Sequence, residues 1–438
     1  MTAFSCSGVS VNRLLPVFLL SIFLAACTTT APEPPPSVAP AEPVEDISVR
    51  PLQVPELTSL PETPARSLAG KFQAVEWGAL PGWQDDNLNQ VWKAFVNNCK
   101  GLMRPVSGSL TMPARATPRV WQPVCAEVLM SGLPEEGSTD TAMIRAFLQR
   151  HLQPWRLLTG TGEIARNTVT GYYEPLIYAS RERTGEYQWP LYASPDDLLT
   201  IDLGTVYPEL AGKRIRGKLD GQRVVPYDTR AQIAQSGDPP PVIVWANDPV
   251  EAFFLQIQGS GRAQLPNGET IRLAYDNHNG RPYASIGKWL ADQGELPLAQ
   301  ASMQNIKAWA KRNPQRVQEM LNANEAMVFF REEAVLDPEL GPKGAYGIAL
   351  IGGRSIAVDT SFVPLGAPVY LATTYPASPT PLRRLVFAQD TGAAIKGAAR
   401  VDYYWGFGDD AGAQAGRMKQ KGEVWVLWPR QAGAPSAR

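Results

Sequence analysis

The sequence is poor in the residues that most often serve as metal ligands and general bases. Its 438 residues contain two histidines, His151 and His278, and neither lies near a cysteine or a cluster of carboxylates. A Ser–His–Asp triad and a histidine-rich zinc site are therefore poorly supplied. We expect carboxylates to carry any catalysis, with no metal and no cofactor.

An excess of charge of either sign is also absent. The 41 Lys and Arg residues and 42 Asp and Glu residues give a formal net charge of -1, without a long basic run. This balance argues against nucleic acid as the main partner. The 40 prolines and 37 glycines predict many short elements joined by turns, which favours a β-rich architecture. The length exceeds that of one typical core, so we expect two domains or one domain with a large insertion.

The N-terminal apolar run is too short to span a membrane. Arg13 precedes apolar residues 14–24, and the segment ends in Leu-Ala-Ala-Cys at 24–27. This pattern is typical of a signal peptide over residues 1–26, and its end resembles a bacterial lipobox. The resemblance implies cleavage before Cys27 and lipidation of its thiol. Thr28, in place of Asp, indicates an outer-membrane lipoprotein that faces the periplasm.

Cysteines are scarce in the rest of the chain. Because Cys6 is removed with the signal peptide, Cys99 and Cys125 are the unmodified pair that remains in an oxidising compartment. The sequence leaves open whether they form a disulfide, since it does not show whether their Cα atoms come within reach. Neither has a neighbouring histidine that would indicate a nucleophile.

A Pro-rich segment follows the lipidation site. Residues 27–66 are dominated by Pro, Ala, Glu and Ser and cannot bury enough apolar surface to fold. At roughly 3 Å per residue such a spacer extends on the order of 100 Å. We interpret it as a disordered tether.

Two helices with one apolar face each are predicted near the start of the folded part. Asp85 or Asp86 would cap the first, and Thr139 or Asp140 the second. The apolar face of the first is formed by Leu88, Val91, Trp92, Phe95 and Val96, and that of the second by Met143, Ile144, Phe147 and Leu148. Helical spacing of this kind predicts core packing rather than a functional role.

Short apolar runs predict the remaining elements. Strands are expected at 242–245, 251–259, 346–351, 355–358, 369–372 and 423–427, and helices at 286–290 and 303–310. As a strand, 251–259 would align Gln256 and Gln258 on one face. Two aligned amides suit a sugar-binding groove, because amides both donate and accept hydrogen bonds, although the solvent face of a sheet explains them equally well.

Residues 385–410 hold the densest chemistry. An apolar run ends in Asp390, and a second extended segment would place Arg400, Asp402 and Tyr404 on one face. Asp is depleted in strands, so the presence of Asp402 in this one has to be explained. The two explanations are catalysis on a sugar and a structural pairing with Arg400. Glu174 ends an extended segment that contains two tyrosines. It serves either as the second carboxylate of a hydrolase or only as a structural residue at the end of a strand.

Several of these segments together resemble one family. They are GYYEP at 171–175, FFLQIQGSG at 253–261, DTSFVPLG at 359–366, QDTGAAIKG at 389–397 and RVDYYWG at 400–406. The chain from about residue 168 resembles the membrane-bound lytic murein transglycosylase A family. The resemblance implies a mainly β fold, in which a double-psi β-barrel with a few helices is built from 67–175 and 340–438. An inserted β-rich substrate-binding domain at 176–339 interrupts it, with a groove between them for a glycan strand.

The resemblance also implies a site with three aspartates. Asp402 would be the catalytic acid and base, and Asp390, Asp359 and Lys396 would support it. A lyase of exotransglycosylase type is expected, which cleaves the bond between N-acetylmuramic acid and N-acetylglucosamine and forms 1,6-anhydro products. One carboxylate suffices, because the C6 hydroxyl of the sugar attacks its own anomeric carbon. Cleavage at chain ends or within strands stays open.

Further residues are expected to contact the glycan. They are Tyr172, Tyr173, Glu174, Tyr404 and Trp405 from the barrel, and Gln256, Gln258 and Ser260 from the insert. The expected partners are peptidoglycan glycan strands, the outer membrane through the lipid anchor, and other cell-wall enzymes. Two alternatives remain, namely an expansin-like lipoprotein that binds glycan without cleaving it, and a hydrolase that uses Asp402 with a second carboxylate from Glu174, Asp359 or Asp390.

Overall fold

The computed structural model describes residues 68–104, 119–131, 141–203, 206–207, 210, 215–392 and 394–435. All of them belong to one compact unit, Pro64–Arg438. The predicted signal peptide, Cys27 and the predicted tether lie outside the described residues. Within these ranges, every helix is too short or too polar to cross a bilayer.

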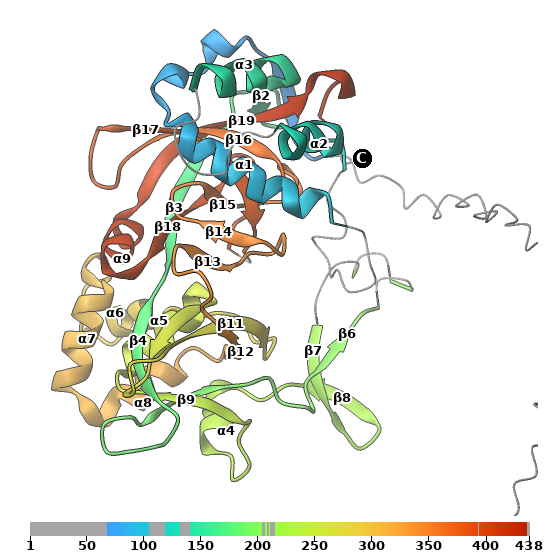
Figure 1. Ribbon diagram of the computed structural model, residues 1–438. Helices are drawn as coiled ribbons and strands as arrows, with labels where there is room; N and C mark the ends of the chain where they lie inside the picture. The colour runs from blue at the N-terminus through green and yellow to red at the C-terminus, as the bar shows by residue number, and fades with distance from the viewer. Residues whose placement is uncertain are drawn as a thin grey trace, which may run out of the picture. The chain divides into compact units, whose positions relative to one another are not determined.

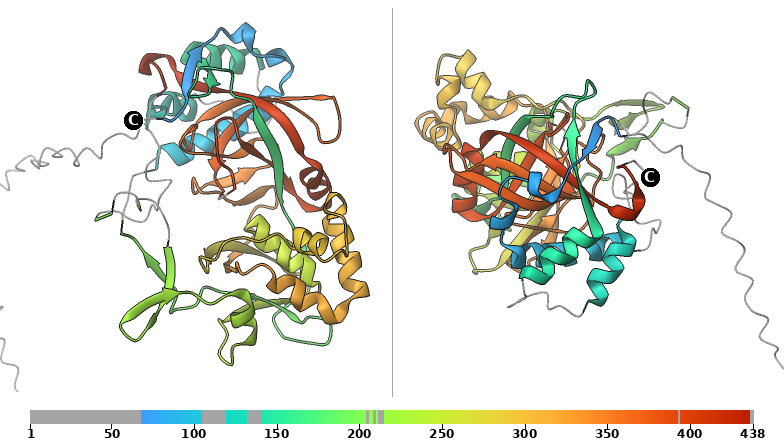
Figure 2. Two further views of the ribbon diagram at one scale, coloured as in Figure 1. Left: turned by 180° about the vertical axis from the view of Figure 1, so that it is seen from behind. Right: turned by 90° about the horizontal axis from the view of Figure 1, so that it is seen from above.

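The first structural core is a sheet that closes on itself (Figure 1). Its strands, in spatial order, are β1 (Lys71–Ala74), β2 (Leu152–Leu158), β19 (Lys419–Pro429), β16 (Pro368–Thr374), β17 (Pro381–Asp390), β15 (Ser355–Val358), β18 (Val401–Phe407) and β3 (Asn167–Glu174). Because β3 pairs with both β18 and β19, the strands from β19 to β3 form a closed ring. Figure 2 shows this ring from behind and from above. The predicted mainly β barrel is therefore confirmed.

Helix α1 (Leu88–Leu102) packs on the barrel as predicted. All five residues of its predicted apolar face are buried, and the ring of Phe95 stacks on Phe387 of β17 at 5.6 Å between centroids. The predicted cap was wrong. Asn87 caps the helix by accepting a hydrogen bond from the Gln90 amide, whereas the carboxylate of Asp86 is bound by Arg354.

Helix α3 (Thr141–His151) lies in the same layer. Its Ile144 and Leu148 are buried as predicted, but Met143 is 53% exposed. Met143 precedes Ile144 directly, so its side chain lies at the edge of the apolar stripe. The predicted caps, Thr139 and Asp140, lie outside the described residues.

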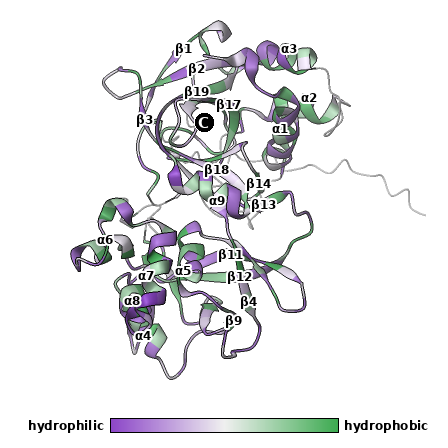
Figure 3. Ribbon diagram, turned by 90° about the vertical axis from the view of Figure 1, so that its left-hand side faces the viewer, coloured by the Kyte–Doolittle hydropathy of each residue, from purple (hydrophilic) through white to green (hydrophobic). Residues whose placement is uncertain are grey.

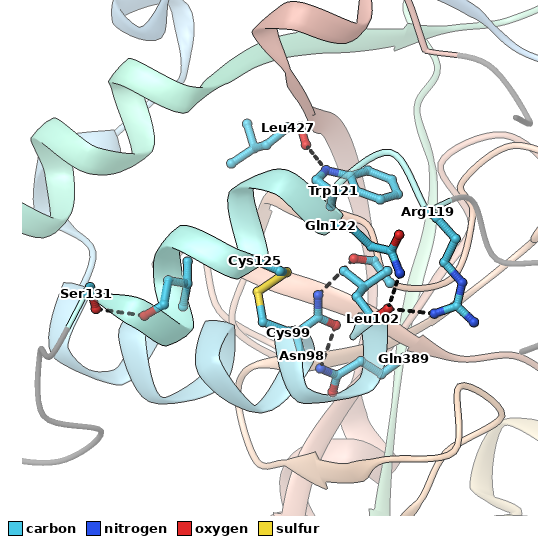
Figure 4. Close-up of a disulfide and its surroundings, with 12 residues drawn as sticks. Asn98, Cys99, Leu102, Arg119, Trp121, Gln122, Cys125, Ser131, Gln389 and Leu427 are labelled. Atoms are coloured by element: carbon cyan, nitrogen blue, oxygen red, sulfur yellow. Dashed lines mark hydrogen bonds between the residues drawn. A yellow bond between two sulfur atoms is a disulfide. The ribbon is translucent and has the colours of Figure 1, made fainter. Parts of the chain in front are cut away.

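A disulfide joins α1 to α2 (Gln122–Met130). Cys99 and Cys125 are bonded, with their Cα atoms 5.0 Å apart (Figure 4). Next to it, the indole nitrogen of Trp121 donates to the carbonyl of Leu427 in β19 at 3.0 Å. The covalent link and this hydrogen bond hold α2 against the barrel.

Residues between β3 and β13 (Leu340–Lys343) build separate sheets. The larger has the spatial order β12 (Val328–Ala334), β11 (Thr270–His278), β10 (Gly261–Gln264), β4 (Leu176–Ser180), β9 (Val242–Ala246) and β5 (Trp189–Tyr192). The smaller consists of β6 (Leu199–Ile201), β7 (Ile215–Asp220) and β8 (Arg223–Pro226). The helices are α4 (Arg230–Gln235), α5 (Pro249–Gln258), α6 (Ile286–Asp292), α7 (Met303–Arg312) and α8 (Val317–Asn322). The strand pairing changes between Glu174 and Leu176, where the insert was predicted to begin.

The strand predicted at 251–259 is wrong, because this segment is helix α5. Asp248 accepts hydrogen bonds from the amides of Val250 and Glu251, and Pro249 occupies the first helical position. Gly259, with φ 82°, ends the helix. A capping Asp, a leading Pro and a closing Gly are start and stop signals that outweigh the alternation of apolar residues. Figure 3 shows hydrophobic residues along α5 beside β11 and β12.

The other predicted elements are mostly present. The strand at 242–245 lies within β9, 355–358 coincides with β15, and 369–372 and 423–427 lie within β16 and β19. The strand predicted at 346–351 is restricted to β14 (Ala349–Ile351), because the backbone turns at Gly347 with φ 80°. Helices α6 and α7 occupy the two predicted helical segments.

A buried ion pair lies where the chain passes from the barrel to the insert. The side chain of Glu174 is 0% exposed and accepts from Nε of Arg272 at 2.6 Å and from Nε of Arg262 at 2.9 Å. The same two guanidinium groups donate to the carbonyl of Leu340, where the chain returns to the barrel. Arg262 and Arg272 of the insert thus bind both segments that connect the insert to the barrel.

Candidate active site

Two of the predicted aspartates flank a single alanine. Strand β15 lies between β17 and β18, and Ala357 is paired with Asp390 on one side and with Asp402 on the other. Residues paired across strands present their side chains on the same face. With strands about 4.8 Å apart, the two aspartates lie on the order of 10 Å from each other across the sheet. The closed sheet therefore brings the two carboxylates to one face.

Asp402 is held from the neighbouring strand. Thr170 of β3 is its register partner in the parallel β3–β18 pair, and the Thr170 hydroxyl donates to Oδ1 of Asp402 at 2.6 Å. Arg400 in turn donates to the Thr170 hydroxyl at 2.9 Å and to the carbonyl of Thr168 at 3.1 Å. Arg400 therefore contacts Asp402 through Thr170 and does not form a direct ion pair with it.

The environment of Asp402 favours its protonated form. Burial raises the pKa of Asp402 above its ordinary value. The hydrogen bond from Thr170 and the charge of Arg400 lower this pKa in part, whereas the charge of Asp390 raises it further. The net direction is upward, as a general acid requires near neutral pH.

Asp390 is surrounded by donors. Its Oδ1 accepts from the backbone amides of Ala345 and Thr391, both at 2.9 Å, and its Oδ2 accepts from the hydroxyl of Tyr172 at 3.1 Å. Burial nevertheless raises the pKa of Asp390. Burial, followed by the charges of Asp390 and Asp402, also raises the pKa of Tyr172 well above its ordinary value, so its phenol remains a donor.

Asp359 connects two loops. Its Oδ1 accepts from the Ser361 amide at 3.0 Å, and its Oδ2 accepts from the Gly397 amide at 2.8 Å. It thereby fixes the segment before β18 to the segment after β15. Lys396, next to Gly397, is exposed and forms no ion pair with a described residue.

Three predicted glycan contacts are placed where a sugar cannot reach them. Glu174 is enclosed between its two arginines. Gln256 is 8% exposed, and its oxygen accepts from the buried guanidinium of Arg230 at 2.8 Å. Tyr404 is likewise 1% exposed and packs against Gly341, where an added Cβ would lie 2.3 Å from its hydroxyl. These three side chains support the site from within.

The other predicted contacts lie closer to the surface. Gln258, at the end of α5, accepts from the backbone amide of Tyr173 at 3.3 Å, which joins the insert to β3. Trp405 is half-buried and donates to the sulfur of Met418 at 3.2 Å. Ser260, which follows the helix end, is the exception, because it is buried at 9% exposed.

Thr170 is the residue at this site that sequence reasoning missed. The alternation in TVTGYYEP puts it on the same strand face as Tyr172. Its pairing with Asp402 depends on a register across 232 positions of sequence, for which no local signal exists. Within the described ranges, no three His, Cys, Asp or Glu side chains converge as a metal site would require.

Comparisons with known proteins identify the class. A family model described as the MltA specific insert domain matches residues 168–331, and one described as the 3D domain matches residues 354–428. Membrane-bound lytic murein transglycosylase A of Escherichia coli (strain K12) is 31% identical over 296 residues, which cover 66% of this chain and 72% of the relative.

Solved structures agree with this match. The crystal structure of MltA from Neisseria gonorrhoeae has a TM-score of 0.70 and 36% identity, covering 85% of this chain and 96% of its own. E. coli MltA with bound chitohexaose has a TM-score of 0.58 and 27% identity, covering 82% and 94% respectively. The barrel, its aspartates and these matches define a lytic transglycosylase, a lyase that acts on peptidoglycan. The chain belongs to the membrane-bound lytic murein transglycosylase A family.

Proposed function

We propose that Asp402 is the single acid and base of a non-hydrolytic cleavage that forms 1,6-anhydro-muropeptides. The observation that carries this assignment is a partly buried carboxyl group with a raised pKa, held through one oxygen by Thr170. Because Thr170 binds Oδ1, the other oxygen, Oδ2, is the one available to a substrate.

The reaction needs one proton and no water. Asp402 donates its proton to the glycosidic oxygen as the bond from C1 of N-acetylmuramic acid to N-acetylglucosamine breaks. The C6 oxygen of the same muramic acid bonds to C1, and its hydroxyl proton returns to Asp402. Ring closure within one sugar gains from proximity, which replaces the second carboxylate of a hydrolase.

The supporting aspartates have different tasks in this proposal. Asp390 holds the Tyr172 phenol and raises the pKa of Asp402 through its charge. Asp359 fixes the loop that precedes β18, and the exposed Lys396 in that loop is a candidate contact for an acidic part of the substrate. Of the predicted glycan contacts, we retain Tyr172, Tyr173, Gln258, Ser260 and Trp405.

The finer location is also a proposal. The relatives are named membrane-bound, which supports membrane association. We propose that Cys27 carries the lipid anchor in the outer membrane and that the tether at 27–66 lets residues 67–438 reach glycan strands in the periplasm. We propose that residues 67–175 and 340–438 form the barrel domain and that residues 176–339 form the inserted domain. One solved relative, E. coli MltA, has bound chitohexaose, which supports glycan as the ligand. Other cell-wall enzymes remain expected partners.

Mass spectrometry of soluble products from purified peptidoglycan tests the reaction and its acid together. The parent chain from Thr28 onward should release anhydro-muropeptides, Asp402→Asn should release none, and the exposed Asp410→Asn should match the parent. Products heavier by one water would show a hydrolase. Full activity of Asp402→Asn would remove Asp402 from the mechanism.

A further inference from the structure

A polar cavity lies at the opposite end of β17 from Asp390. Its volume is about 290 Å³. The residues that line it are Asp85, Asp86, Asn87, Arg354, Tyr375, Pro381, Leu382, Arg383 and Arg384. Six residues of strand separate Arg384 from Asp390, or roughly 20 Å at 3.3 Å per residue. The cavity is therefore separate from the candidate active site.

Arg384 is a half-buried cation without a carboxylate partner in the described part of the chain. The printed contact of its guanidinium group is a long hydrogen bond, 3.4 Å, to the hydroxyl of Tyr375. Its position depends on Gly353, whose φ is 75°, because an added Cβ would lie 2.8 Å from Nη1 of Arg384. Burial opposes the charge of Arg384, but Tyr403, Tyr375 and Asp86 outweigh it and raise its pKa on balance, so the group stays a cation that an anion in the cavity can bind.

Arg383 is placed in a similar way. It is exposed, and the described residues give it no ion pair. Its side chain packs over Gly82, whose φ is 66°, since an added Cβ there would lie 2.8 Å from Cδ and 3.0 Å from Nη1 of Arg383. The two left-handed glycines thus leave room for one guanidinium group each, and Oδ2 of Asp85 lies 3.1 Å from the same added Cβ at Gly82.

The buried carboxylate in the cavity wall is bound by Arg354, and its charge also acts on Arg384. Asp86 binds both Nη atoms of Arg354, at 2.8 and 2.9 Å, and accepts from the Leu385 amide at 2.7 Å. Asp85 lies exposed at the rim and is the one carboxylate of the lining without an ion pair. The lining holds the guanidinium groups of Arg354, Arg383 and Arg384 against the carboxylates of Asp85 and Asp86, which leaves the cavity with one net positive charge.

We propose that this cavity binds the free C-terminal carboxylate of a short peptide, such as the stem peptides that peptidoglycan carries. A guanidinium fork matches the two oxygens of a carboxylate. Pro381 and Tyr375 give the same cavity an apolar wall for the last side chain of the peptide, whereas the side chain of Leu382 is buried in the core. The distance from Asp390 implies that the bound peptide does not belong to the bond being cleaved. The choice of ligand rests on the family's action on peptidoglycan.

Calorimetric titration of the purified chain tests this site without any cleavage. The probes are N-acetyl-D-Ala–D-Ala, its C-terminal amide and inorganic phosphate. The acid should bind saturably, and the amide at least ten times more weakly. Arg383→Gln and Arg384→Gln should each weaken binding of the acid about tenfold or more, whereas Arg312→Gln, an exposed arginine at the end of α7, should bind like the parent.

Three results would overturn the proposal: equal binding of acid and amide, parent-like binding by both cavity variants, or binding of phosphate without binding of the acid. Arg383 is exposed, so its variant should keep the parent's unfolding temperature. Cleavage of glycan without peptides should also stay at the parent's rate in Arg383→Gln. That readout separates a failure of this site from a failure of the assignment of Asp402.

Discussion

Replacing Glu174 with alanine should destabilise the chain far more than a surface carboxylate would. Glu174 is 0% exposed, and its partners Arg262 and Arg272 are 4% and 8% exposed at the side chain. Removing one partner from a buried ion pair leaves uncompensated charge and costs about 3–5 kcal/mol. Here two guanidinium groups lose their shared anion, although both keep a hydrogen bond to the Leu340 carbonyl. We therefore expect a loss near 4 kcal/mol, or a drop of roughly 10 °C in the unfolding temperature.

The matched control is a carboxylate that binds arginine at the surface. Glu332 pairs with Arg181, and both side chains are more than a third exposed. Exposed pairs of this kind contribute about 0–1 kcal/mol. Urea unfolding of Glu174→Ala and Glu332→Ala, followed by circular dichroism, measures both. If Glu174→Ala loses no more stability than Glu332→Ala, the two arginines do not depend on Glu174 and the reasoning is refuted.

Three further predictions concern the site and the disulfide. Thr170→Val removes a hydrogen bond that lowers the pKa of Asp402, so the alkaline limb of kcat/KM against pH should move to higher pH, whereas Thr170→Ser should keep the parent's profile. Because the folded pKa of Asp390 is raised, its contribution to stability is fully present below the unfolded pKa and is lost as pH rises through the folded pKa. Asp390→Asn should therefore gain stability relative to the parent between acidic and neutral pH in thermal unfolding, and a constant difference would contradict this. Replacing Cys99 and Cys125 with serine should lower the free energy of unfolding by about 3 kcal/mol for a loop of this length, as measured in urea, and an unchanged midpoint would show that the bond does not constrain the unfolded chain.

The sequence predicted those parts of the fold whose signals are local. The apolar spacing of α1 gave its buried face, and the apolar runs of β15 and β16 gave their strands. The error at α5 arose because FFLQIQ alternates as a strand does, while the deciding residues, Asp248 and Pro249, lie just before it. Helix start signals therefore deserve more weight than a short alternation.

The site was predictable as a set of residues but not as a geometry. Asp390 was singled out at the end of an apolar run and Asp402 as an Asp within a predicted strand, whereas Asp359 was singled out by family resemblance. The pairing of Ala357 with two aspartates and the hydrogen bond from Thr170 follow from strand register, which forms between distant segments. Glu174 was misjudged because its two arginines are supplied by β10 and β11, far along the chain.

The closed ring of strands also sets the order in which this molecule can be assembled. Strand β3 is synthesised early, yet both of its partners, β18 and β19, come from the last part of the chain. Until β18 and β19 pair with it, β3 has free edges. Asp402, which lies on β18, then lacks both the hydrogen bond from Thr170 and its position beside Ala357. Contacts of such long range form slowly in folding. A chain whose last strands have not yet left the ribosome therefore has no completed site around Asp402. Its ability to cut a glycan strand begins only when the ring of strands closes.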